Sequence, residues 1–361
     1  MTSNPQPRAD LAAIPAYVAG RPPTPRPGLI GYKLSSNENP YPPLPGVLDA
    51  AVAAAQEMNR YPDMGSAQLY QALAGRLGVP SDHLAVATGS VALIYQLLSA
   101  YCTHGEPHDE VVHAWRSFEA YPIAVTVAGA RSVRVPLTAD GRHDLDAMAA
   151  AVTERTKVVL LCTPNNPTGP ALTQTEVEVF LARVPSHVVV VLDEAYVEFV
   201  RSPDPVDGVA TVLAHPNVVV TRTFSKAYGL AGFRVGYAVA QPQLAAALRA
   251  VSLPFGVSHV AQAAAIASLE AEEALLERVE ALVAERTRVL AAVRAAGWDV
   301  PESQGNFIWF PVGDRAGEFA AAAEELGITV RPFAGDGVRV TIGEDEASDR
   351  VVELARSFPR T

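Results

Sequence analysis

From about residue 84 onward, short apolar runs rich in β-branched residues alternate with stretches of helical character. The runs are LAVAT, EVVHA, SVRVP, KVVLLC, VVVVLD, VVVTR and VGYAVA. Strands that are apolar on both faces belong to a sheet covered on both sides, and alternation with helices makes such a sheet mostly parallel. The pattern therefore predicts an α/β fold whose large domain has a mostly parallel central sheet. Among its helices we expect residues 91–102 and 173–183.

The chain changes character after about residue 245. Apolar residues at three- or four-residue steps predict one long helical region from about residue 258 to 296. The steps are marked by Leu275, Val279, Leu282, Arg286, Val289 and Val293. Three strand candidates follow, NFIWF, ITVRP and GVRVTI, with helices expected at about 314–326 and 344–356. A smaller α/β domain is therefore expected to close the chain.

These patterns predict four segments. Proline is frequent in residues 1–30, so this segment is expected to be an extended N-terminal arm rather than a helix or central strand. Residues 31–45 are expected to join the small domain, residues 46–245 to form the large domain, and residues 246–361 to form the small C-terminal domain.

The charge balance restricts the class of partner. The 361 residues include 28 basic and 39 acidic side chains, a formal net charge of −11. That charge repels nucleic-acid backbones and anionic lipids.

No apolar span of about 18 residues and no signal-peptide pattern occurs, so a cytoplasmic enzyme is expected. Cys102 and Cys162 lie in apolar runs and are expected to be buried, and the eight histidines show no zinc-ligand spacing.

Two local signals lie where strands of the predicted sheet end. TGSVA at residues 88–92 joins a strand to a helix, so the N–H groups near Ser90 and Val91 can bind a phosphate monoester. Phe118 follows the strand EVVHA at the edge where open α/β sheets bind ligands, and it can stack on a pyridine ring. A core phenylalanine fits the same position equally well.

Two further signals suit the polar atoms of that ring. PNNPTG at residues 164–169 forms a rigid turn from which Asn166 can donate to a phenolate oxygen. Asp193 ends the apolar strand VVVVLD, where a buried carboxylate needs a cationic partner such as a protonated pyridine nitrogen. Tyr196 can bond the ring hydroxyl. The alternative is that Asp193 only caps a turn.

The fifth signal is TFSKAYGLAGFRVG at residues 223–236. Lys226 lies between a strand and a segment rich in glycine, a setting in which burial and neighbouring cations favour a nucleophilic amine for Schiff-base chemistry. Ser225 and Arg234 can then hold the phosphate. A surface lysine and a salt-bridged arginine would leave the glycines unexplained.

In this order the motifs resemble those of fold-type I enzymes dependent on pyridoxal 5′-phosphate (PLP), and within them the histidinol-phosphate and aromatic amino acid aminotransferase family. The similarity runs from about Lys33 to the C-terminus. The matching strings are LSSNENPY, RYPD, NNPTG, DEAY and SKAYGLAGFRVGY. The resemblance implies the PLP-dependent transferase fold, PLP on Lys226 as a Schiff base, and Asp193 as the partner of the pyridine nitrogen. It also implies a homodimer with the active site at the subunit boundary.

The resemblance assigns further residues by position. Implied cofactor contacts are Ser90, Val91, Phe118, Asn166, Tyr196, Ser225 and Arg234, with Tyr61 reaching the phosphate from the neighbouring subunit. Implied substrate contacts are Asn37, Arg331, Phe333 and Arg339. Arg339 matches the arginine that binds an α-carboxylate, which suits a bidentate guanidinium.

The connection between Arg331 and Arg339 decides the expected substrate. It is short and contains Phe333, as in the aromatic branch of the family, and Trp115-Arg116-Ser117 fits the same branch. We therefore expect transamination of phenylalanine, tyrosine or tryptophan with 2-oxoglutarate, giving an aromatic 2-oxo acid and L-glutamate.

Three other readings remain. Transamination of histidinol phosphate in histidine biosynthesis is the alternative that the shared motifs and Arg331 leave open. Decarboxylation or β-elimination on the same scaffold is a second, because fold does not determine function. A transcriptional regulator would need a DNA-binding module, for which the 30-residue arm is too short.

Overall fold

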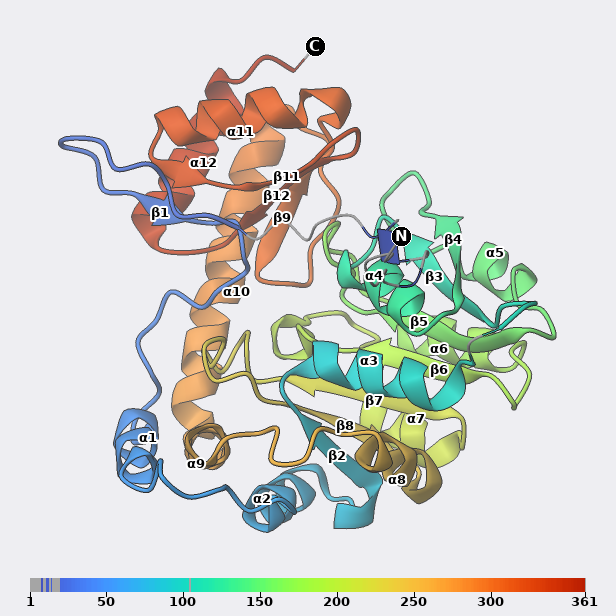
Figure 1. Ribbon diagram of the computed structural model, residues 1–361. Coiled ribbons are helices and arrows are strands. Elements are labelled where there is room, and N and C mark those ends of the chain that lie inside the picture. The colour runs from blue at the N-terminus through green and yellow to red at the C-terminus, as the bar shows by residue number, and fades with distance from the viewer. Residues whose placement is uncertain (1–7, 9–10, 13, 15–19, 104, 361) are drawn as a thin grey trace, which may run out of the picture.

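The computed structural model describes residues 8, 11, 12, 14, 20–103 and 105–360 (Figure 1). Much of the predicted arm at residues 1–30, and His104, therefore lie outside the described residues. The chain forms two lobes, a larger one around a central sheet and a smaller one that contains the C-terminus (Figure 1). None of the helices in the described ranges is long and apolar enough to cross a membrane.

The larger lobe contains a seven-stranded sheet in the order β2-β8-β7-β6-β5-β3-β4. Its strands are β2 (Leu84–Ala87), β3 (Glu110–Trp115), β4 (Arg131–Pro136), β5 (Thr156–Cys162), β6 (Val189–Asp193), β7 (Val218–Thr223) and β8 (Gly236–Ala240). Strand β8 runs antiparallel to both of its neighbours, and the other pairs are parallel. The prediction of a mostly parallel sheet is confirmed.

Alternate residues of the central strands enter two separate hydrophobic cores. In β5, Val158 and Leu160 face one core, whereas Val159 and Leu161 face the other. All four side chains are fully buried, which explains why the strand reads as one continuous apolar run. Both cysteines are buried in this region as predicted.

Helices cover both faces of this sheet (Figure 1). They are α3 (Ser90–Tyr101), α4 (Ala120–Val127), α5 (Leu145–Ala150), α6 (Gln174–Leu181), α7 (Gly208–Ala214) and α8 (Pro242–Ala250). The helices predicted at 91–102 and 173–183 correspond to α3 and α6. Short 3₁₀ helices occur at η2 (Ser81–His83), η3 (Val197–Phe199) and η4 (Gly313–Arg315).

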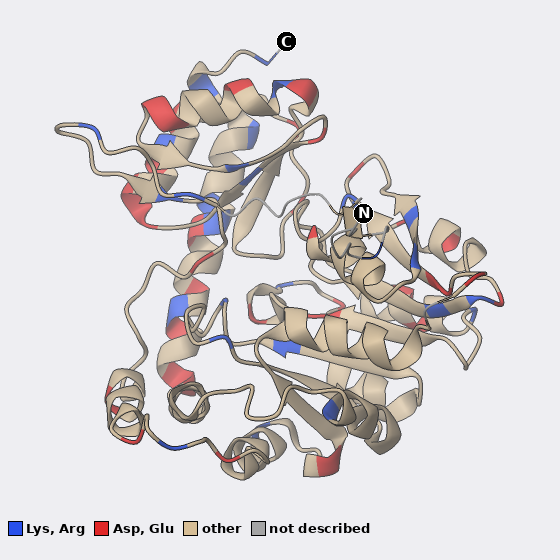
Figure 2. Ribbon diagram, viewed as in Figure 1, with Lys and Arg blue, Asp and Glu red and all other residues tan. Residues whose placement is uncertain are grey.

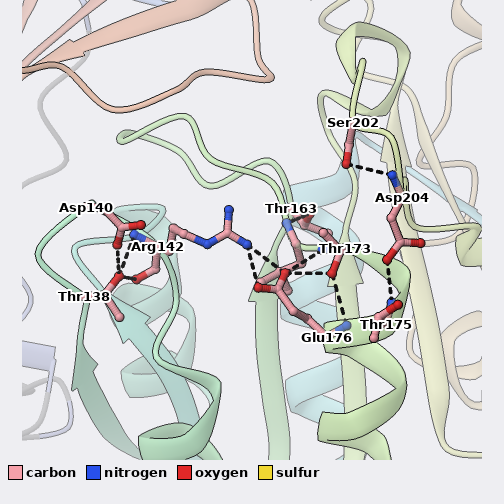
Figure 3. Close-up of polar contacts among 10 residues, drawn as sticks. Thr138, Asp140, Arg142, Thr163, Thr173, Thr175, Glu176, Ser202 and Asp204 are labelled. Carbon is pink, nitrogen blue, oxygen red and sulfur yellow. Dashed lines mark hydrogen bonds and ion pairs between the residues drawn. The ribbon is translucent and has the colours of Figure 1, made fainter.

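A polar network fixes the start of α6 (Figure 3). Thr173 accepts a hydrogen bond from the backbone N–H of Glu176, whose carboxylate accepts one from the N–H of Thr173. This capping box satisfies helix donors that would otherwise lack partners. Arg142 binds the Glu176 carboxylate at 2.7 Å, so the loop after β4 is attached to the same helix end.

The long helical region predicted at 258–296 is wrong in one respect, because it consists of two helices. These are α9 (His259–Glu270) and α10 (Glu272–Ala295), separated at Ala271. Helix α9 packs against α1 (Val47–Ala55) and α2 (Ala67–Leu77), whereas α10 packs against α12 (Asp345–Ser357) in the other lobe. The different packing partners turn the chain at Ala271. Glu272 and Glu273 lie in the first turn of α10, where acidic side chains favour a helix start.

The smaller lobe is built on a three-stranded antiparallel sheet in the order β11-β12-β9. Its elements are β9 (Phe307–Phe310), β11 (Arg331–Phe333), β12 (Gly337–Thr341) and α11 (Ala316–Glu325), with α10 and α12 packed beside them. Helix α10 carries both acidic and basic residues along its length (Figure 2).

The run ITVRP, predicted as one strand, forms two, β10 (Ile328–Thr329) and β11. They separate because β10 pairs with β1 (Tyr32–Lys33), whereas β11 pairs with β12. The segment that follows the arm is thereby attached to the smaller lobe.

The boundary predicted between residues 245 and 246 lies inside α8, which packs against β2 and β8 of the large sheet. We propose a boundary at Ala271 instead, where α9 ends and α10 begins.

Candidate active site

A cavity of about 220 Å³ lies at the carboxyl ends of β3, β5, β6 and β7, and the β11–β12 hairpin of the smaller lobe completes its wall. Residues predicted as site residues make up most of its lining. They are Ser90, Val91, Phe118, Asn166, Asp193, Tyr196, Ser225, Lys226, Arg234, Arg331, Phe333 and Arg339. The carboxyl ends of parallel strands meet at one sheet edge, which brings motifs from distant parts of the chain together.

One end of the cavity is suited to an anion. Helix α3 begins there at Ser90, and Arg234 donates a hydrogen bond to the Ser225 hydroxyl at 3.0 Å. Gly89 has a φ of 92°, and a Cβ at this position would lie 2.6 Å from Nη2 of Arg234. Glycine therefore lets the guanidinium lie against the N-terminus of α3. A phosphate group would receive both helix N–H groups and a cation in this place.

Asp193 at the end of β6 also lines the cavity. Its carboxylate accepts hydrogen bonds from the Tyr121 hydroxyl at 2.6 Å and the Thr221 hydroxyl at 3.2 Å. The residue is only 4% exposed, and this burial raises the pKa of its carboxyl group, although the two hydroxyls counteract the shift. A cationic partner would stabilise the ionised form. The site therefore fits a protonated pyridine nitrogen.

Lys226 projects into the same cavity, and its Nζ donates to the carbonyl oxygen of Ser36 at 3.0 Å. Burial of the amine, together with the positive charge of the Arg339 guanidinium, lowers the pKa of Lys226 to about 7. A substantial fraction of the amine is therefore uncharged near neutral pH. An uncharged lysine amine is a nucleophile and a base.

Two arginines lie side by side at the other end of the cavity. Arg331 in β11 and Arg339 in β12 are directly opposite in the antiparallel register, so both side chains lie on one face of the sheet. Arg339 donates to the backbone carbonyl of Ser35 at 2.8 Å, and Arg331 donates to the Glu119 carboxylate at 2.7 Å. Phe333 lies in the same lining.

Two predicted residues lie outside this lining. Asn37 is fully buried behind the wall, and its side-chain amide donates to the Tyr196 hydroxyl at 2.9 Å. Tyr61 is 83% exposed, and its ring contacts the ring of Phe255 at a centroid distance of 4.7 Å. The contribution of Tyr61 to a neighbouring subunit stays a prediction.

Sequence reasoning missed several residues of the site. Tyr121 bonds Asp193 directly, and its position three residues after Phe118 is a helical spacing that would place both side chains on one side. Glu119 and the serines at 35 and 36 also line the cavity. In the described part of the chain, no group of three or more His, Cys, Asp or Glu residues is placed to hold a metal ion.

The chain is similar in sequence to known proteins along nearly all of its length. The chain is 57% identical to the aromatic amino acid aminotransferase of Streptomyces avermitilis, with 99% of this chain and 98% of that protein covered. It is 53% identical to the protein of the same name from Thermobifida fusca, with 98% and 97% covered.

Among solved structures, the histidinol-phosphate aminotransferase of Sinorhizobium meliloti in complex with pyridoxal-5′-phosphate matches with a TM-score of 0.86 and 29% identity, covering 99% of both chains. The predicted fold class is thereby confirmed. Residues 30–354 match the family model of aminotransferase class I and II, and the chain belongs to that family.

Proposed function

We propose that this protein is a PLP-dependent aminotransferase that transfers the amino group of an aromatic L-amino acid to 2-oxoglutarate, giving an aromatic 2-oxo acid and L-glutamate. The observation that carries the proposal is the Lys226 amine, whose pKa burial lowers to about 7, in one cavity with Asp193 and the anion site at Arg234. The names of relatives that are 51–57% identical support the same activity.

The lining residues fit PLP part by part. Ser90, Val91, Ser225 and Arg234 would hold the phosphate, Asn166 and Tyr196 the ring oxygen, and Phe118 one face of the ring. Asp193 would pair with the pyridine nitrogen. When bound, PLP supplies an electron-withdrawing ring that stabilises negative charge at the substrate Cα.

The protein's own groups would bind the substrate and move its proton. Arg339 would bind the α-carboxylate as a two-pronged guanidinium and so direct Cα towards Lys226. The Lys226 amine, uncharged in part near neutral pH, would take the proton from Cα and then donate it to the cofactor carbon that holds the amino group. The Asp193 carboxylate, held by Tyr121 and Thr221, would place a negative charge beside the pyridine nitrogen.

The substrate side chain would lie near Phe118 and Phe333, both of which line the cavity. Two aromatic rings favour an apolar, planar side chain over a phosphate. Histidinol phosphate is not favoured as the substrate, because the aromatic enzymes are 51–57% identical to this chain, whereas the matched histidinol-phosphate enzyme is 29% identical.

Steady-state kinetics test the substrate assignment. We expect kcat/KM for phenylalanine to exceed that for histidinol phosphate by more than about tenfold at one concentration of 2-oxoglutarate, which corresponds to about 1.4 kcal/mol in transition-state binding. A preference of the same size for histidinol phosphate would overturn the assignment.

We also propose that two copies form a homodimer with Tyr61 at the boundary. The proposal is supported by exposed apolar side chains at Met58 and Met64, which are close to Tyr61 in the chain, and at Phe255, whose ring it contacts. Light scattering that gives the mass of a single chain at assay concentration would refute it.

The two cysteines are both free, which supports a location in a reducing compartment such as the cytoplasm.

A further inference from the structure

We infer that Glu119 is a specificity-determining residue: it holds Arg331 in an ion pair and so keeps the side-chain end of the substrate cavity free of net charge. The inference rests on the proposed function, because it concerns the side chain of the amino donor. It assigns a role to a residue that none of the sequence motifs includes.

The ion pair is formed by residues that are 212 positions apart in the chain. Glu119 follows Phe118 and directly precedes α4, and Arg331 lies in β11 of the smaller lobe. Nη2 of Arg331 lies 2.7 Å from Oε2 of Glu119, and the two side chains are 9% and 29% exposed. Both residues line the cavity, so the pair forms part of the surface that a substrate contacts.

The charges of the cavity lining identify what the pair does. Besides Glu119 and Arg331, the charged residues among the described residues of the lining are Asp193, Lys226, Arg234 and Arg339. Under the proposed function, each of these four has a counterpart in the cofactor or in the amino and carboxylate groups that all amino-acid substrates share. Arg331 is the cation that remains for the variable side chain, and Glu119 neutralises it.

A neutral end of the cavity favours an uncharged side chain. The Arg331 guanidinium lies 5.6 Å from the centroid of the Phe333 ring, so an aromatic substrate would meet a stacked, already paired arginine. A side chain with a carboxylate or phosphate would have to compete with Glu119 for Arg331 and would be repelled by it. The carboxylate of Glu119 therefore lowers the affinity of the cavity for anionic side chains relative to uncharged ones.

A second ion pair provides a matched control. Arg116 binds Asp336 at 2.5 Å, and like the first pair it joins the segment after β3 to the β11–β12 hairpin. Both residues line a neighbouring surface hollow rather than the cavity described above. Breaking this pair removes a contact between the same two elements, and neither of its residues belongs to the cavity lining.

The experiment compares two carboxylic acids on the holoenzyme. Glutarate and 3-phenylpropionate each carry one carboxylate for Arg339, but the far end is a second carboxylate in the first and a phenyl ring in the second. Their dissociation constants are measured by titration calorimetry for the wild type, Glu119→Gln and Asp336→Asn. The absorption spectrum of the bound cofactor verifies that each variant is folded and loaded.

We expect Glu119→Gln to tighten glutarate binding by about tenfold, the size of one charge-assisted hydrogen bond. Binding of 3-phenylpropionate should change by less than about threefold. Asp336→Asn should leave the ratio of the two constants unchanged, and Glu119→Asp, which keeps the charge, should retain most of the wild-type ratio. In an Arg331→Gln background, Glu119→Gln should have no further effect on the ratio.

Four results would overturn the inference: an unchanged ratio in Glu119→Gln, an equal shift in Asp336→Asn, a shift that persists without Arg331, or no binding of either acid to the wild type. Failure of the proposed function gives a different pattern. In that case the Glu119→Gln shift in binding would be present, but the wild type would not transfer the amino group of phenylalanine to 2-oxoglutarate.

Discussion

Replacing Lys226 with methionine should stabilise the protein without cofactor, and more so at low pH than at high pH. In the folded chain, desolvation of the amine and the nearby Arg339 guanidinium lower the pKa of Lys226 from 10.5 to about 7. The unfolded chain therefore binds one more proton than the folded chain between about pH 7 and pH 10.5. Folding stability consequently rises with pH through this window, and the cost of burying the amine is greatest below pH 7.

The magnitude follows from the size of the shift. A change from 10.5 to about 7 corresponds to an upper limit of about 5 kcal/mol at roughly 1.4 kcal/mol for each pH unit. Because the Lys226 side chain is only partly buried, solvent screening reduces this value, and we expect about 3 kcal/mol at pH 6. At pH 9 the variant should retain less than half of this advantage.

Urea unfolding of both apoproteins at pH 6 and pH 9, at one protein concentration, measures the two differences in the free energy of unfolding. The reasoning is refuted if the variant is no more stable than the wild type at pH 6. It is also refuted if its advantage is larger at pH 9. Arg234 should keep the cofactor-free site intact in both proteins, because its bond to Ser225 does not involve Lys226.

Two further substitutions test the cofactor site. Tyr121→Phe removes the hydroxyl that donates to Asp193 at 2.6 Å. The value of kcat should therefore fall by roughly tenfold while the cofactor remains bound. An unchanged kcat would show that this hydrogen bond does not contribute to turnover. Gly89→Ala places a Cβ near the Arg234 guanidinium at a positive φ, and equilibrium dialysis should show about tenfold weaker PLP binding. Gly75→Ala, which meets no atom within 4 Å, is the control and should bind PLP normally.

The sequence predicted the parts of the site that depend on local structure. Gly89, Asn166, Asp193 and Lys226 each lie in a short motif at the end of a strand or in the turn that follows, and parallel strands bring these ends to one sheet edge. Their convergence on one cavity follows from strand order alone. The alternation of apolar runs with helical stretches likewise predicted that both faces of the large sheet are covered.

Contacts between distant segments could not be predicted in this way. The bond from Tyr121 to Asp193 and the ion pair between Glu119 and Arg331 join residues 72 and 212 positions apart. No spacing rule relates such residues. The separation of α9 from α10 at Ala271 was missed for a similar reason, because the helical pattern continues while the packing partners change from one lobe to the other.

The central claim is that Lys226 carries the cofactor, and the small number of lysines makes a direct test possible. The sequence contains three, Lys33, Lys157 and Lys226. Lys33 lies 2.9 Å from Glu38 and Lys157 lies 3.7 Å from Asp109, so both are in ion pairs. Borohydride reduction of the protein loaded with PLP, followed by digestion and mass spectrometry, should find the cofactor's mass on the peptide that contains Lys226. Its presence on the peptide of Lys33 or Lys157, or on none of the three, would contradict the assignment.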